Sequence, residues 1–186
     1  MAKLYKTTLL IVITLVVIIY AKIFLILEMP THDSIMWYGV FHYYMESFIS
    51  GSIPYWDPYT VTGMPFYPNI PLNGLLDPLV LPIAVFTKLF DLSLLTGFIY
   101  LHLARMVIFA WGAYYLFRYI SKCPLSSLVS AGVLFLAIAP VNFRQSEVDV
   151  VFLTPFALYF LLKFFDVEGV SKKYLYFLLF VLLTGI

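Results

Sequence analysis

The feature that most constrains this chain is a series of long apolar segments separated by shorter polar ones. They cover residues 8–27, 94–119, 125–143, 150–165 and 174–186. A helix rises about 1.5 Å per residue, so about 20 apolar residues cross the ~30 Å hydrocarbon core of a bilayer. The chain is 63% hydrophobic and 11% charged, whereas soluble domains hold roughly 45–50% apolar and about 25% charged residues. We therefore expect an all-α integral membrane protein with about five transmembrane helices, forming a single membrane domain over residues 1–186.

The first and last of these segments each allow two interpretations. Lys3 and Lys6 before residues 8–27 are typical of a signal peptide, but the apolar run exceeds the usual length of roughly 7–15 residues and no small-residue cleavage site follows it. We interpret it as a retained signal anchor. The sequence ends inside the apolar segment 174–186. Either this fifth helix is short and buried against the others, or the chain is the front piece of a longer protein, which we favour because half-crossed helices leave carbonyls without partners in lipid.

The charged residues predict the orientation in the membrane. Seven of the eleven basic residues fall at one face: Lys3, Lys6, Arg118, Lys122, Lys163, Lys172 and Lys173. By the positive-inside rule that face is cytoplasmic. We therefore expect a multi-pass protein of the plasma membrane with a cytoplasmic N-terminus and a large outer loop over residues 28–93. Cys123, the single cysteine, falls in a predicted cytoplasmic turn and excludes an internal disulfide.

The outer loop is predicted to contain interfacial helices. Ser34 to Ser50 is typical of a helix, which Asp33 or Ser34 can cap and Gly51 can end. Its many aromatic residues favour a position along the membrane interface. The proline-rich residues 53–68 exclude a regular helix and predict a fixed loop packed on the spans. Residues 72–90 predict a short re-entrant or interfacial helical piece.

The motif in this loop resembles that of a known superfamily. Gly51-Ser52-Ile53-Pro54-Tyr55-Trp56-Asp57-Pro58-Tyr59, followed by Gly63-Met64-Pro65, resembles the GT-C polytopic membrane glycosyltransferases. More narrowly it is similar to the bacterial YfhO-type proteins and to the membrane domain labelled "6-pyruvoyl-tetrahydropterin synthase-related". Leu153-Thr154-Pro155-Phe156 matches the leucine-proline opening found there. The resemblance implies a GT-C-like N-terminal portion that is truncated, because relatives have more spans, and that is inactive alone.

The resemblance implies a catalytic role for Asp33, as general base or metal ligand, when a sugar moves from a polyprenyl phosphate to an acceptor hydroxyl. The alternative for Asp33 is a plain helix N-cap. His32 could assist in binding substrate, although an interfacial side chain is the simpler role. Trp56 and Asp57 would shape the substrate site, although an Asx turn also explains Asp57.

Further candidates lie in and after the second span. Arg105, with His102 one turn before it, is an intramembrane charge that could contact a lipid-linked phosphate or pair with an acid of another helix. Arg144 could also stabilise the phosphate. Glu147 and Asp149 could join Asp33 around Mg or Mn, which prefer oxygen ligands, or could be solvated loop charges.

The sequence thus predicts a glycosyltransferase acting at the outer face on a polyprenyl-linked sugar donor, with the lipid bilayer as its surroundings. The alternative is a non-catalytic polytopic protein, a transporter or assembly subunit, on the same scaffold. No basic patch with interleaved aromatic residues indicates a nucleic-acid partner.

Overall fold

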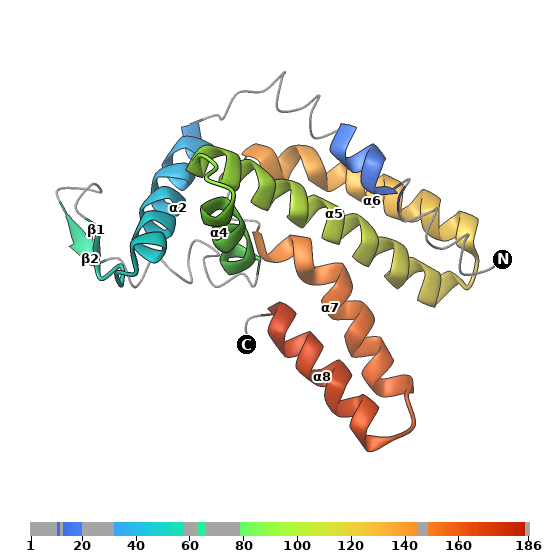
Figure 1. The fold of residues 1–186 in the computed structure, drawn as a ribbon. Helices are drawn as coiled ribbons and strands as arrows, with labels where there is room; N and C mark the ends of the chain where they lie inside the picture. The colour runs from blue at the N-terminus through green and yellow to red at the C-terminus, as the bar shows by residue number, and fades with distance from the viewer. Residues whose placement is uncertain are drawn as a thin grey trace.

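The computed structural model describes residues 11, 13–19, 32–57, 63–65, 79–144 and 149–184 (Figure 1). In these ranges the chain is almost entirely helical, which confirms the all-α prediction. Two strands of two residues each are the exception. The elements are α2 (His32–Ser50), β1 (Trp56–Asp57), β2 (Met64–Pro65), α4 (Val80–Leu89), α5 (Leu94–Ser121), α6 (Pro124–Arg144), α7 (Asp149–Asp166) and α8 (Val170–Thr184). Residues 13–19 are also helical.

The helices occupy the predicted apolar segments. α5, α6 and α7 coincide with residues 94–119, 125–143 and 150–165 to within two residues at each end. α8 begins at Val170 rather than at Tyr174, directly after Gly169, whose φ of 118° breaks the chain direction. Of the predicted first span, residues 11 and 13–19 are helical and the remainder lies outside the described residues.

α5 is the helix around which the described part of the chain is assembled. Ser93 caps its first turn, since its hydroxyl oxygen accepts a hydrogen bond from the Thr96 N–H at 3.2 Å. Lys122 ends the helix in the left-handed conformation, with φ 57°, and its N–H donates to the Arg118 carbonyl at 3.2 Å. α2, α4, α6 and α7 all contact α5 (Figure 1).

Two apolar cores form along α5, one around each half. The first joins residues of α2 and α4 to the start of α5: Phe41, Met45, Val80, Ala84, Phe98 and Leu101. The second joins residues 13–19, α6 and α7 to the rest of α5, with Ile13, Val17, Met106, Phe109, Phe135 and Phe152 among its members. Burying one large apolar side chain contributes roughly 1.5–3 kcal/mol. The helices α2 and α4 are therefore part of the folded body.

Two glycines allow close helix crossings on α5. A Cβ at Gly97 would lie 2.5 Å from Thr87 Oγ1 of α4, and a Cβ at Gly112 would lie 2.9 Å from the backbone nitrogen of Phe156 in α7. Small residues at such crossings let helix backbones approach, as they do in membrane bundles. α8 in turn packs on α7 (Figure 1).

The C-terminal end of α2 is held in two ways. Gly51, at φ 74°, donates to Phe48 O, and Ser52 N–H donates to Ser47 O, which together form a Schellman motif and confirm that Gly51 ends the helix. Lys88 Nζ of α4 donates to Ile49 O at 2.7 Å. α4 has 10 residues, so at about 1.5 Å per residue it is far shorter than a span.

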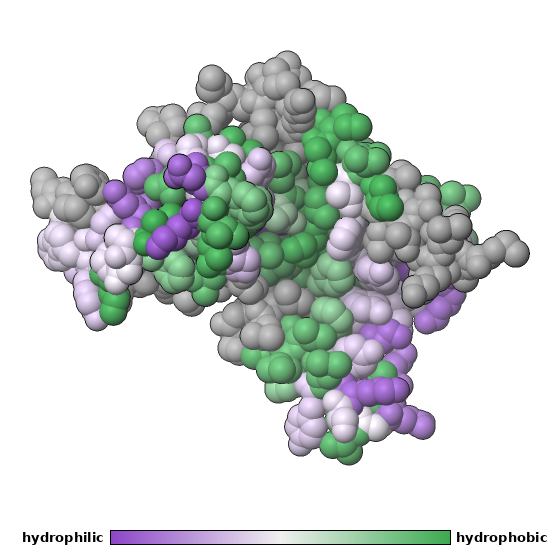
Figure 2. All heavy atoms as spheres, in the orientation of Figure 1, coloured by the Kyte–Doolittle hydropathy of each residue, from purple (hydrophilic) through white to green (hydrophobic). Residues whose placement is uncertain are grey.

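One helix of the described ranges, α5, is long and apolar enough to cross a membrane, and 39% of its most apolar window is buried. Val80–Leu89 and Pro124–Ile138 are apolar but shorter. Large apolar side chains are exposed along α6, at Leu125, Val129, Val133 and Leu136. Figure 2 shows hydrophilic residues over α2 and near the α7–α8 turn, with hydrophobic residues between them. Exposed apolar surface of this kind marks contact with lipid or with another protein.

Candidate functional site

The predicted catalytic residue lies in the first turn of α2. The helix begins at His32, so Asp33 and Ser34 lie inside the first turn rather than at the cap. An acidic residue there is favourably placed toward the positive end of the helix dipole. The side chains of His32 and Asp33 lie outside the described part of the chain, and their roles stay predictions.

An aromatic cluster joins α2 to the start of α5. The Phe98 ring lies 5.6 Å from Tyr38 and 5.2 Å from Phe41, centroid to centroid. The His102 ring lies 4.5 Å from Phe98 on the same side of α5. The structure therefore brings His102 toward α2, where Tyr38 also contacts His42 at 5.7 Å.

Arg105 lies in the interior of the molecule and not on an open surface. Its side chain is fully buried, one turn after His102 on α5. Burying a guanidinium is costly, so interior arginines depend on polar or charged neighbours to hold them. The two roles that the sequence leaves open for Arg105, phosphate contact and ion pair, both stay predictions. In either role the partner of Arg105 must reach a side chain in the protein interior.

The motif loop is built around Trp56. β1 pairs antiparallel with β2, with Trp56 opposite Pro65 and Asp57 opposite Met64. Gly63 has φ 99°, and a Cβ there would lie 2.8 Å from Trp56 Nε1, so only glycine fits against the indole. The Tyr43 hydroxyl of α2 donates to the Trp56 carbonyl. In its described residues the proline-rich segment is thus attached to α2, and Ile53, Tyr55 and Trp56 are exposed, so the predicted packing of this loop on the spans stays a prediction.

The second group of predicted residues lies between α6 and α7. Arg144 is the last residue of α6 and Asp149 the first of α7, while Glu147 lies outside the described residues. α2 contacts α6, and Figure 1 shows the start of α2 and the end of α6 at the same end of the molecule. The described residues contain no group of three or more His, Cys, Asp or Glu suited to a metal ion. The side chains of Asp33 and Asp149 are outside that part, so the divalent-cation site stays a prediction.

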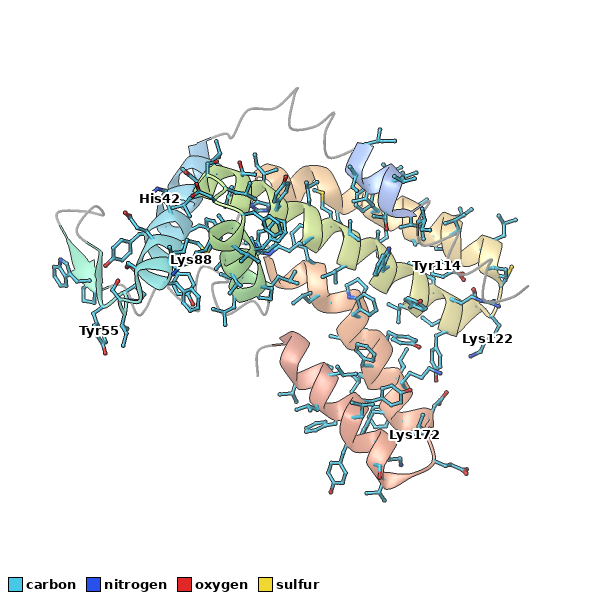
Figure 3. All side chains as sticks on the ribbon, in the orientation of Figure 1. His42, Tyr55, Lys88, Tyr114, Lys122 and Lys172 are labelled. Atoms are coloured by element: carbon cyan, nitrogen blue, oxygen red, sulfur yellow. The ribbon has the colours of Figure 1, made fainter. Side chains whose placement is uncertain are left out.

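A cavity that the sequence did not predict lies at the opposite end of α5. It measures about 310 Å³ and is lined by Tyr114, Tyr115, Arg118, Tyr119, Lys122, Tyr159 and Lys163. Figure 3 shows Tyr114 and Lys122 near this end and His42 and Tyr55 far from it. The available signal was four-residue spacing, which puts Arg118 with Lys122 and Tyr159 with Lys163 on single helix faces.

The fold and these sites define an all-α protein with one membrane-capable helix among its described residues, an ordered aromatic loop at one end and a basic, tyrosine-lined cavity at the other. Comparison with protein families, curated proteins and solved structures finds no match to this chain. Function must therefore be argued from the geometry and from the motif resemblance.

Proposed function

We propose that this chain is a GT-C-like glycosyltransferase, or the N-terminal part of one, that crosses the plasma membrane about five times, with its N-terminus in the cytoplasm. The observation that supports the proposal is the packing of the motif: Trp56 contacts both Gly63 and Pro65. A hydrogen bond from Tyr43 joins this motif to α2, the helix that begins with His32 and Asp33. A motif that merely linked two spans would need neither the close glycine contact nor the anchor to α2.

The separation of polar ends also supports a membrane-spanning arrangement. Hydrophilic residues gather over α2 and near the α7–α8 turn, and apolar side chains are exposed between them (Figure 2). In a bilayer those apolar side chains would face lipid at no cost. α5, with 28 residues, reaches about 42 Å at about 1.5 Å per residue, enough for the ~30 Å core.

The reaction would transfer a sugar from a polyprenyl phosphate to an acceptor hydroxyl. The acceptor oxygen forms a bond to the anomeric carbon while the bond from that carbon to the phosphate oxygen breaks, and the polyprenyl phosphate leaves with the electron pair. The Asp33 carboxylate takes the hydroxyl proton. Arg144 or Arg105 would stabilise the phosphate charge, and Trp56 and Asp57 would shape the acceptor side.

The proposal includes a divalent cation held by carboxylates. The ligands would be Asp33, Glu147 and Asp149, whose carboxylate oxygens Mg and Mn prefer, and the helix that carries Asp33, α2, contacts α6. When bound, such an ion would neutralise phosphate charge. The proposal does not depend on it, because Asp33 can act as a base without it.

The test is Asp33→Asn in the full-length gene product, with Glu46→Gln as the matched control. Glu46 is on the same helix, and its side chain is 61% exposed and 3.7 Å from His42 Nδ1. We expect Asp33→Asn to abolish glycan product at unchanged protein level, and Glu46→Gln to leave it intact. Asparagine keeps the shape of the side chain and removes only its charge, which near a helix N-terminus contributes about 0.3–1 kcal/mol, so lost product at unchanged protein level is not explained by misfolding. Unchanged product in Asp33→Asn would overturn the enzyme proposal and favour the non-catalytic scaffold.

The proposal also predicts that the 186-residue chain is inactive alone. Purified chain would be assayed for sugar transfer from polyprenyl-phosphate donors. Robust turnover would contradict the view that it is one part of a larger enzyme.

A further inference from the structure

The cavity between α5 and α7 carries unbalanced positive charge. Arg118, Lys122 and Lys163 line it, and in the described ranges none of the three forms an ion pair with a carboxylate. Asp166, at the end of α7, accepts the hydrogen bond of the Tyr119 hydroxyl. Lys122 Nζ and Lys163 Nζ lie over the Tyr119 ring, 4.2 Å and 4.7 Å from its centroid. Cations gathered around one cavity repel each other, and an anion between them would relieve that repulsion.

Arg118 has donor capacity that the described residues do not use. Its Nη1 atom is buried and has no hydrogen-bond partner among them. A buried charged donor without an acceptor is costly, and an anion in the cavity would supply the acceptor. The planar guanidinium presents paired N–H groups that match two oxygens of one phosphate.

Lys122 lines this cavity from a left-handed backbone position. It adopts φ 57° at the C-terminus of α5, a left-handed position that glycine occupies most readily. Glycine there would end the helix without strain, whereas lysine adds a charge beside Tyr119.

The position of the cavity indicates where the anion comes from. It lies at the end of the apolar helix α5, and four of its lining residues are tyrosines, the residues that gather where a membrane meets water. Basic pockets between membrane helices bind phosphate-bearing lipid headgroups. About 310 Å³ is at the small end of ligand sites and suits a headgroup whose acyl chains remain in the bilayer.

We propose that this cavity binds the phosphate of an anionic lipid headgroup in the leaflet opposite α2, through Arg118, Lys122 and Lys163. The inference rests on the membrane part of the proposed function and is independent of glycosyl transfer. Asp33→Asn protein should therefore bind lipid normally, so the failure of one proposal is distinguishable from the failure of the other.

The experiment measures thermal unfolding of the full-length protein in detergent during titration with phosphatidylglycerol, phosphatidylcholine or inorganic phosphate, each at equal ionic strength. We expect phosphatidylglycerol to raise the melting temperature and the other two to do so weakly or not at all. Arg118→Gln should weaken the apparent affinity about tenfold or more, the loss expected for a charge-assisted hydrogen bond. Lys172→Gln is the matched control, because Lys172 is an exposed lysine near the same end (Figure 3) that does not line the cavity.

Lys122→Gly distinguishes a loss of lipid binding from a loss of folding. It removes one charge from the cavity and also relieves the left-handed strain, so the protein should fold at least as well while binding phosphatidylglycerol more weakly. Equal affinity of Arg118→Gln, Lys122→Gly and Lys172→Gln, or equal responses to phosphatidylglycerol and phosphatidylcholine, would overturn the proposal. A response to inorganic phosphate as strong as that to phosphatidylglycerol would overturn the lipid source and assign the site to a soluble phosphate compound.

Discussion

Gly112→Ala tests how α5 and α7 are held together. A Cβ at this position would lie 2.9 Å from Phe156 Cδ2 and 2.9 Å from the Phe156 backbone nitrogen. The ring can turn aside, but the backbone nitrogen cannot, so the two helices must separate by a few tenths of an ångström. The same separation would disturb the contact between Tyr115 and Tyr159, 5.8 Å apart in the wall of the basic cavity.

Two opposing effects set the magnitude. Overpacking a well-filled contact costs about 1–3 kcal/mol, and replacing glycine by alanine inside a helix gains up to about 1 kcal/mol. Gly132→Ala shows the gain without the overpacking, because Gly132 is also inside a helix, α6, and a Cβ there meets nothing within 4 Å. The free energy of unfolding of Gly112→Ala should therefore lie about 1–3 kcal/mol below that of Gly132→Ala.

Thermal unfolding in detergent, followed by near-ultraviolet circular dichroism, is the assay. For a chain of this size about 1 kcal/mol corresponds to roughly 2–4 °C, so Gly112→Ala should melt roughly 2–12 °C below Gly132→Ala. Trp111 is adjacent to the substituted residue and donates to Thr14 Oγ1 at 3.1 Å, so its signal reports the local change. Equal melting temperatures for the two variants would refute the close crossing of α5 and α7.

Two further predictions concern the ends of the molecule. Gly63→Ala should make the motif loop more sensitive to protease than Gly51→Ala does. Both positions have positive φ, but only a Cβ at Gly63 would meet Trp56, at 2.8 Å. Equal protease sensitivity of the two variants would contradict the packing of the motif on the indole. Backbone N–H groups at the start of α6 hold the pKa of the exposed Cys123 thiol below its usual range. As the pH is raised, the alkylation rate of Cys123 should therefore increase at a lower pH than the alkylation rate of free cysteine does, because the thiolate is the reactive form. In intact cells a membrane-impermeant maleimide should label this single cysteine only after permeabilisation, and labelling before it would refute the cytoplasmic position.

The helices were predictable because their signals are local. An apolar run follows Ser93, whose side chain caps α5, and Gly51 ends α2 in the predicted place. The packing of Gly63 against Trp56 was less accessible, because the sequence gives the prolines and the turn but not which ring fills the turn. The start of α2 shows the same limit, since the capping pattern at Asp33 and Ser34 fits several registers and the helix begins at His32.

The basic cavity shows most clearly why local pattern is insufficient. Arg118, Lys122 and Lys163 were interpreted only as positive charges that keep their face in the cytoplasm, and the exposed Lys172 and Lys173 serve that purpose equally well. Topology requires charge on one side of the membrane, but it does not require a buried guanidinium nitrogen or a lysine in a left-handed turn. The cavity itself forms only where α5 and α7 meet, a contact between residues far apart in the chain. The contact of α5 with α7 thus brings Arg118, Lys122 and Lys163 around one cavity, and the binding of one anion there would give the buried Arg118 nitrogen its acceptor.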